Sequence, residues 1–259
     1  DEVVAELNKE GRITLITHDR NRGLAASRNT GLRQASGKYV CYLDDDDRFL
    51  PHHLRTLVSH LETTKSRVVY ADAWRVHEAM DGERLIEVRR DRPYSEPFNP
   101  HQLLIGNYIP VLSLMHERAL LDEAGYFDES LFVHEDWDLW IRMATCCEFT
   151  HIAECTAEFT WRTDGSSMSS ISQDAFVRTT EIIYRKYGPY AAKYPAVFEG
   201  QQNHLRDLKR AQVQKRFTCS IIIPVWNKVE LTQQCLVALG PATEDVSFEL
   251  IVVDNHSTD

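Results

Sequence analysis

The stretch "GKYVCYLDDDDRFLP", residues 37–51, places four consecutive aspartates directly after a short apolar segment. The apolar and aromatic residues of 38–43 predict a buried strand. In open α/β sheets, ligands bind at the carboxyl ends of the strands, so an acidic run at this position indicates a binding site. Strand-like and helix-like patterns alternate on both sides of it, which is typical of an α/β fold with a largely parallel sheet.

The alternation continues through most of the chain. Strands are predicted at 12–18 and 67–76, and helices at 51–64, 116–127 and 135–144. In the last of these helices the tryptophans Trp137 and Trp140 fall on one helical stripe, which predicts a buried face. Residues 81–100 are predicted to form an exposed excursion. The charge-rich segment 172–216 predicts a helical spacer after a main body at 1–171.

Residues 217–259 begin the pattern again. An apolar strand at 217–228, a helix at 229–240 and a strand at 247–259 predict the β-α-β opening of a nucleotide-binding fold. When the two chain ends are joined, residues 258, 259, 1 and 2 spell T-x-x-E, a capping box that starts a helix. A circular permutation and a fragment of a tandem array both fit this order, and the length of 172–216 favours the fragment.

Composition excludes several classes of protein. The formal charge of −10 argues against nucleic-acid binding, which needs a basic face. The six cysteines form no CxxC pair, so we expect neither disulfides nor a zinc site. No apolar run could span a bilayer and residues 1–12 do not resemble a secretion signal, so we expect a cytoplasmic protein, with peripheral membrane association left open.

Two familiar motifs are excluded by spacing near the acidic residues. Counted from Asp44, the glycine and glutamate of a calcium-binding EF-hand would fall on Phe49 and Arg55. An H-E-x-x-H zinc protease would need histidine where Asp138 stands. The alternatives that remain for the aspartate run are a metal and ligand site or a solvated acidic loop.

Taken in the order 217–259 and then 1–171, the chain resembles the family 2 glycosyltransferases, which have the Rossmann-like GT-A fold. The stretches that carry the resemblance are "SIIIPVWN", "ELIVVDNHSTD", "NRGLAASRNTGL", "GKYVCYLDDDDRFLP", "GNYIPV", "GYFDESLFVHEDWDLWIRMA" and "WRTDGSSMS". The resemblance implies a mostly parallel sheet flanked by helices. It also implies an inverting transferase that moves a sugar from a nucleotide-diphosphate sugar to a hydroxyl group.

The resemblance assigns the metal to the aspartate run. By likeness to the family's D-x-D motif, Asp46 binds Mn²⁺ or Mg²⁺, Asp44 lies near the metal or the ribose, and Asp47 supports them. Carboxylate oxygens suit these hard cations, and clustered like charges favour a bound cation. The family likeness assigns the nucleotide sugar to residues from both ends of the chain: Pro224, Val225, Trp226, Asp254, Asn21, Gly23, Arg28, Asp44, Asp45 and Arg162.

The start of the predicted helix 135–144 supplies the proposed base. The resemblance implies that Asp136 takes the proton of the acceptor hydroxyl, that Glu135 orients the base or the acceptor, and that Gly106 and Asn107 border the acceptor. Judged by position alone, N-terminal capping would be the better interpretation of Asp136, and the surrounding family motifs favour the base. The implied acceptor is a saccharide or a lipid-linked saccharide in polysaccharide or glycoconjugate synthesis. Donor sugar and linkage stay open.

Two rival functions remain. A sugar-nucleotide pyrophosphorylase shares the α/β plan, but residues 217–228 lack its Gly-rich loop. A non-catalytic remnant that binds a nucleotide sugar is favoured by the split order of the chain and disfavoured by the retained Glu135 and Asp136. Loss of donor hydrolysis in Asp136→Asn, with binding kept, would separate the enzyme from the remnant.

The split order generates a prediction about stability. Residues 217–259 are predicted to complete the sheet of 1–171, within one chain or by exchange in a domain-swapped homodimer. Deletion of 217–259 should therefore expose apolar strand faces and give an unfolded or aggregating protein. A truncated chain that is soluble and melts cooperatively in calorimetry would contradict this.

Overall fold

The computed structural model describes residues 13–82, 84–162, 173–216, 219–225, 227, 229–242, 248–254, 257 and 258. The chain divides into two compact units, Asp1–Gln201 and Gln202–Asp259. The helix predicted at the start of the chain and most of the "WRTDGSSMS" stretch lie outside the described residues. None of the described helices is both long enough and apolar enough to cross a bilayer.

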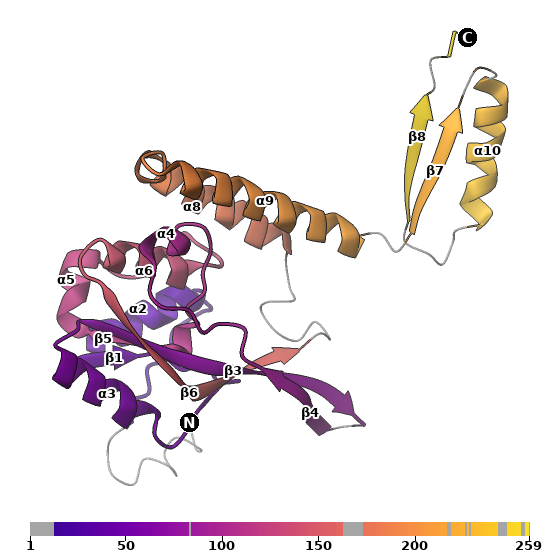
Figure 1. Cartoon of the computed structure of the whole chain (residues 1–259). Coiled ribbons are helices and arrows are strands. Elements are labelled where there is room, and N and C mark those ends of the chain that lie inside the picture. Colours follow the sequence, from indigo (N-terminus) through magenta and orange to yellow (C-terminus); the bar gives the residue numbers. More distant parts are fainter. Residues whose placement is uncertain are drawn as a thin grey trace. The chain divides into compact units, whose positions relative to one another are not determined.

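The first unit is built on a six-stranded sheet (Figure 1). The strands run in the order β1-β5-β3-β6-β2, and β4 pairs with β3. Their bounds are β1 Tyr39–Cys41, β2 Arg48–Phe49, β3 Val68–Asp81, β4 Arg84–Asp91, β5 Leu114–Glu117 and β6 Phe149–Arg162. The α/β class predicted from the sequence is confirmed.

The expectation of a mostly parallel sheet is wrong in detail for this unit. Only the β3–β6 ladder is parallel, and the four other described ladders are antiparallel. Strands β3 and β4 show the reason. A parallel pair needs a connection of a dozen or more residues, but Asp81 at the end of β3 pairs with Arg84 at the start of β4, so these strands must run antiparallel. Part of the predicted exposed excursion is therefore strand β4. Residues 13–18, predicted as a strand, are irregular, since no described strand pairs with them.

Helices cover both faces of this sheet. On one face, α3 (His53–Thr64) packs Leu57 and Leu61 against Val69 and Ala71 of β3. The larger core on the other face includes α2 (Leu24–Gln34), α4 (Pro100–Leu103), α5 (Leu121–Ala124) and α6 (Glu135–Ala144). Two 3₁₀ turns, η1 (Val111–Ser113) and η2 (Arg118–Leu120), flank β5.

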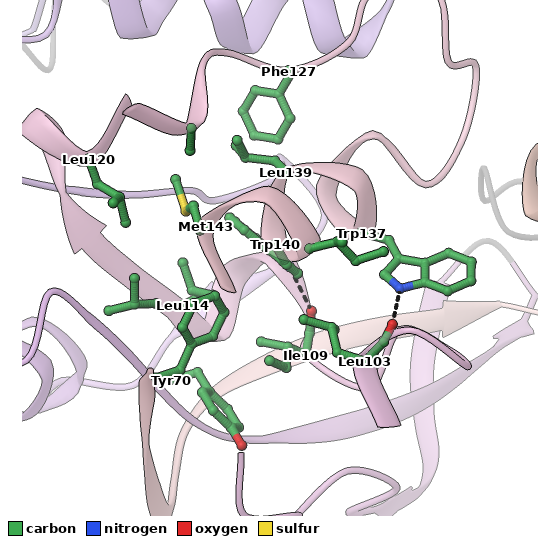
Figure 2. Close-up of a cluster of buried hydrophobic side chains, with 14 of the residues drawn as sticks. Tyr70, Leu103, Ile109, Leu114, Leu120, Phe127, Trp137, Leu139, Trp140 and Met143 are labelled. Carbon is green, nitrogen blue, oxygen red and sulfur yellow. Dashed lines mark hydrogen bonds between the residues drawn. The ribbon is translucent and has the colours of Figure 1, made fainter. Parts of the chain in front are cut away.

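The two tryptophans of α6 anchor the larger core (Figure 2). Trp137 and Trp140 are almost completely buried, as their spacing predicts. Each indole N–H donates to a backbone carbonyl, Trp137 to Leu103 at 2.6 Å and Trp140 to Ile109 at 3.2 Å. A buried tryptophan needs such a partner, and these two bonds tie α6 to the end of α4 and to the chain segment that follows it.

The segment predicted as a helical spacer forms two helices, α8 (Gln173–Ala191) and α9 (Pro195–Arg216). Ile183 and Ala191 of α8 and Val197 of α9 are buried in the larger core. The hydroxyl of Tyr187 on α8 donates to the Asp138 carboxylate on α6 at 2.7 Å. Helix α8 and the first turns of α9 therefore pack as part of the first unit.

The second unit contains the predicted β-α-β pattern. Strands β7 (Cys219–Val225) and β8 (Phe248–Asp254) pair in parallel on each side of α10 (Val229–Ala242) in the sequence. Their ladder places Pro224 opposite Val253 and Val225 opposite Asp254. These two strands make a sheet of their own among the described residues.

A buried histidine on β5 makes stability depend on pH. His116 Nδ1 lies 2.8 Å from the Glu117 carbonyl, which can only accept, so Nε2 accepts from the Tyr42 hydroxyl at 2.8 Å. Burial lowers the pKa of His116 to about 4. An unfolded histidine titrates near 6.5, so the unfolded chain binds a proton that the native protein does not.

The free energy of unfolding should therefore decrease as the pH falls from about 6.5 towards 4. We expect urea unfolding to show that wild type loses about 2 kcal/mol more than His116→Gln between pH 7.5 and pH 5. The exposed His101 provides a matched control, and His101→Gln should keep the wild-type dependence. Equal losses in wild type and His116→Gln would contradict the assignment.

Candidate active site

A cavity of about 1010 Å³ opens in the first unit where β1 ends and α6 begins. Its wall includes all four aspartates of 44–47, Arg28 of α2, and the pair Glu135 and Asp136 at the start of α6. Residues far apart in the sequence thus converge at the carboxyl end of a strand, where α/β folds bind ligands.

The aspartate run is anchored to the neighbouring strand β6. The Asp47 N–H donates to the Asp44 carbonyl at 3.1 Å, which forms a turn. Thr160 of β6 then makes two bonds, from its N–H to the Asp47 carboxylate at 3.0 Å and from its hydroxyl to the Asp46 carbonyl at 2.7 Å. Burial raises the pKa of Asp47 to about 7, with help from the neighbouring Asp46 charge. The turn is therefore held in one shape and is not a loose acidic loop.

Arg28 joins the aspartate run to α6. Its guanidinium donates to the two carboxylate oxygens of Asp44 at 2.7 and 3.0 Å and to Glu135 at 2.5 Å. The side chains of Arg28 and Glu135 are only 9% and 6% exposed. Burial alone would lower the pKa of Arg28, but the charges of Asp44 and Glu135 outweigh it and raise that pKa. A buried cation between two anions satisfies the requirement that buried charges be paired.

The backbone at the start of α6 is under local strain. His134 has a left-handed backbone with φ of 62°, which is uncommon for a residue other than glycine. Such conformations persist where the surrounding structure fixes them, and they concentrate at functional sites. The left-handed conformation of His134 turns the chain, and α6 begins at the next residue with Glu135 and Asp136 on the cavity wall.

The Asp136 carboxylate is held in one orientation. It accepts from the side-chain amide of Asn107 at 3.0 Å and from the Trp137 N–H at 2.7 Å. Burial raises the pKa of Asp136, and the charge of Arg28 and the Asn107 bond oppose that rise. Burial and the Asp136 charge raise the pKa of Glu135 to about 7. Adjacent carboxyl groups with raised proton affinity are typical of residues that act as general acid or base.

Most of the predicted residues of the body lie on this cavity, and some do not. Asp44, Asp45, Asp46, Arg28, Asn107, Glu135 and Asp136 line it, whereas Asn21, Gly23, Gly106 and Arg162 are absent from its described lining. Asn21 accepts from the Gly23 N–H at 2.9 Å and shapes the entry to α2. Arg162, predicted to bind the nucleotide sugar, pairs with Glu78 of β3 at 3.1 Å.

The predicted nucleotide residues of 217–259 lie in the second unit. Val225 and Asp254 are ladder partners at the carboxyl ends of β7 and β8. The Asp254 carboxylate accepts from the N–H and the hydroxyl of Ser257, which lowers its pKa. Trp226 lies outside the described residues. The structure thus brings Pro224, Val225 and Asp254 to one end of this two-stranded sheet.

Sequence reasoning missed Thr160 and the structural role of Asn29. Thr160 anchors the aspartate run from a position 113 and 114 residues away, and no local pattern marks it. Asn29 is buried, and its amide binds both backbone groups of Phe127 at 2.9 Å, so it fixes the loop that leads to α6. The family likeness assigns Asn29, with Asn21, Gly23 and Arg28, to the segment along the nucleotide sugar, and that role stays a prediction.

The sequence profile described as Glycosyl transferase family 2 matches residues 1–122. This match covers just under half of the chain, and together with the fold it shows that the chain is similar to the family 2 glycosyltransferases, which have the GT-A fold. An uncharacterized glycosyltransferase, YwdF of Bacillus subtilis, is 34% identical over 54% of this chain and 52% of its own length. The glucosyltransferase WfgD of Escherichia coli, which is named for UDP-Glc and GlcNAc-diphosphoundecaprenol, is 27% identical over 64% of this chain and 61% of its own.

Among solved structures, S. aureus TarS 1-349 is similar, with a TM-score of 0.57 and 18% identity over 93% of this chain and 66% of that chain. Its complex with UDP-GlcNAc has a TM-score of 0.53 and 19% identity over 71% of this chain and 53% of that chain. These neighbours show the shared fold. The chain spans about half of the YwdF sequence.

The role of Arg28 can be tested by removing its charge. Arg28→Met leaves Glu135 buried without its cation, so the free energy of unfolding should fall by about 3–5 kcal/mol. Arg33→Met is a matched control on the same helix, because Arg33 is 52% exposed and pairs with Glu129 at 3.6 Å. Arg33→Met should lower the free energy of unfolding by no more than about 1 kcal/mol. Similar losses in the two variants, measured by urea unfolding, would contradict the assignment.

Proposed function

We propose that this family 2 transferase moves a sugar from a nucleotide-diphosphate sugar, UDP- or dTDP-linked, to a hydroxyl acceptor with inversion at the anomeric carbon. The observation that carries the proposal is the Asp136 carboxylate, oriented by Asn107 on the wall that also holds the aspartate run. The UDP-GlcNAc complex of TarS and the name of WfgD support a UDP-sugar and a saccharide or lipid-linked acceptor.

The reaction assigned to the site is a single in-line displacement. Asp136 accepts the proton of the acceptor hydroxyl as its oxygen bonds to the anomeric carbon, while the bond from that carbon to the diphosphate breaks. The leaving group carries its electron pair away as a nucleoside diphosphate. The ion pair of Arg28 with Glu135 holds the start of α6, and therefore Asp136, in place. Proximity of donor and acceptor supplies much of the acceleration.

The donor atoms of the aspartate run fit a divalent cation. Asp44 and Asp46 present hard carboxylate oxygens on the cavity wall, but no group of three or more metal-ligating side chains gathers within the described part of the chain. Mg²⁺ is commonly held by one or two carboxylates together with phosphate oxygens, so two aspartates are enough when a diphosphate is present. Bound there, Mg²⁺ or Mn²⁺ would neutralise charge on the leaving diphosphate.

Replacement of the proposed base tests the function. Asp136→Asn keeps the shape of the side chain but cannot accept the proton, so donor hydrolysis and transfer should fall by at least about 100-fold. Binding should persist, seen as a rise in melting temperature with UDP or dTDP in the presence of Mn²⁺. GDP and CDP test nucleotide selectivity, and omission of Mn²⁺ tests the metal.

The exposed Asp122 of α5 provides the matched control, and Asp122→Asn should keep wild-type turnover. Unchanged turnover in Asp136→Asn would exclude Asp136 as the base. Binding of a nucleotide sugar without any turnover by wild type would favour the non-catalytic alternative.

A further inference from the structure

Three consecutive backbone carbonyls, those of residues 103–105, each accept a hydrogen bond from a different helix. The Trp137 indole of α6 donates to the first at 2.6 Å, as Figure 2 shows. The Gln201 amide of α9 donates to the second at 2.8 Å, and the Tyr184 hydroxyl of α8 donates to the third at 2.6 Å. We call this set of carbonyls the 103–105 row.

The 103–105 row stands where α4 ends. The last carbonyls of a helix have no partner inside the helix, so side chains or water must satisfy them. Here the partners are side chains from three helices, and Gln201 is buried. Gly200 of α9 lies against the Ile105 side chain, and a Cβ at that position would lie 2.5 Å from Ile105 Cδ1, so the end of that side chain would have to shift.

The row leads directly into the proposed catalytic site. Two residues beyond its last carbonyl, Asn107 donates to the Asp136 carboxylate at 3.0 Å. The Asn107 side-chain oxygen also accepts from the Ile109 N–H at 3.1 Å, which sets the orientation of the amide. On the other side of Asp136, the ring of Trp137 packs edge-on against Tyr184, with centroids 6.0 Å apart. Tyr184 thus touches both segments that meet at Asp136.

We infer that Tyr184 and Gln201 are positioning residues of the active site, which hold Asn107 against Asp136 by fixing the 103–105 row. The inference rests on the proposed role of Asp136 as the base. Both residues lie beyond residues 1–122, where the family profile matches, and within the segment predicted as a spacer. Helix α8 and the start of α9 accordingly belong to the catalytic apparatus.

The inference has a consequence for proton affinity. The Asn107 bond favours the charged form of Asp136 and holds its pKa down against the effect of burial. The other charged or titratable groups that act on this carboxyl are Arg28 of α2, Asp44 after β1, Glu135 of α6 and the hydroxyl of Tyr94. If the row loosens and Asn107 withdraws, the pKa of Asp136 rises and the acid limb of the pH profile moves to higher pH.

The test uses the full chain and removes one hydrogen bond at a time. Tyr184→Phe keeps the ring that packs on Trp137, and Gln201→Met keeps the length of the side chain. Each should lower kcat about tenfold, the equivalent of one hydrogen bond, with the donor KM unchanged. The acid limb of kcat should move to higher pH in both, and the melting temperature shows that the variants are folded.

Matched controls lie on the same helices. Tyr190→Phe on α8 and Gln202→Met on α9 change exposed side chains and should reproduce the wild-type profile. Values of kcat and pH profiles in Tyr184→Phe and Gln201→Met that match these controls would overturn the inference, even if the variants are less stable.

A second readout does not depend on turnover. NMR titration of the Asp136 carboxyl, assigned with Asp136→Asn, should show a higher pKa in Tyr184→Phe and Gln201→Met than in the controls. An unchanged pKa would overturn the positioning role whether or not the chain is active. Full activity of Asp136→Asn, by contrast, would remove the proposed function, so the two failures are distinguishable.

Discussion

The structure of the site depends on the cost of burying charge. Glu135 is buried and Asp44 and Asp136 are half-buried on the same cavity wall, where an unpaired carboxylate would be disfavoured. Arg28 makes the arrangement possible because the two terminal nitrogens of its planar guanidinium donate to different carboxylates, Nη2 to Asp44 and Nη1 to Glu135. Helix α2, the turn after β1 and the start of α6 must therefore keep one relative position, and most of the other contacts serve to maintain it.

Those contacts form two supports. On the sheet side, Thr160 of β6 binds the aspartate run at two points and prevents the acidic turn from moving into solvent. On the helix side, the tryptophans of α6 are buried in the larger core and donate hydrogen bonds to Leu103 at the end of α4 and to Ile109 beyond it. The same helix therefore has an apolar face that holds the core together and an N-terminus that carries the carboxyl groups of the site.

Different parts of this arrangement were predictable to different degrees. The burial of Trp137 and Trp140 follows from helical periodicity, and the place of Asp44 follows from its position after an apolar strand, because both signals are local. The direction of the strands was predicted less well, since alternation of helix and strand does not report which strands become neighbours. Arg162 shows the same limit of prediction from sequence. Its acidic partner in the structure, Glu78 of β3, is close in space but distant in the sequence.

The sequence by itself determined the α/β class, the acidic turn at a strand end and the pair Glu135 and Asp136 at a helix start. Each of these features depends on a short run of residues whose backbone preferences and polarity decide the local structure. Only the tertiary structure decided that Arg28 bridges Asp44 and Glu135, that Asn107 orients Asp136 and that α8 packs beside them. Those choices depend on hydrogen bonds and charge pairs between distant residues, and such pairs are selected by packing and by the need to satisfy buried polar groups.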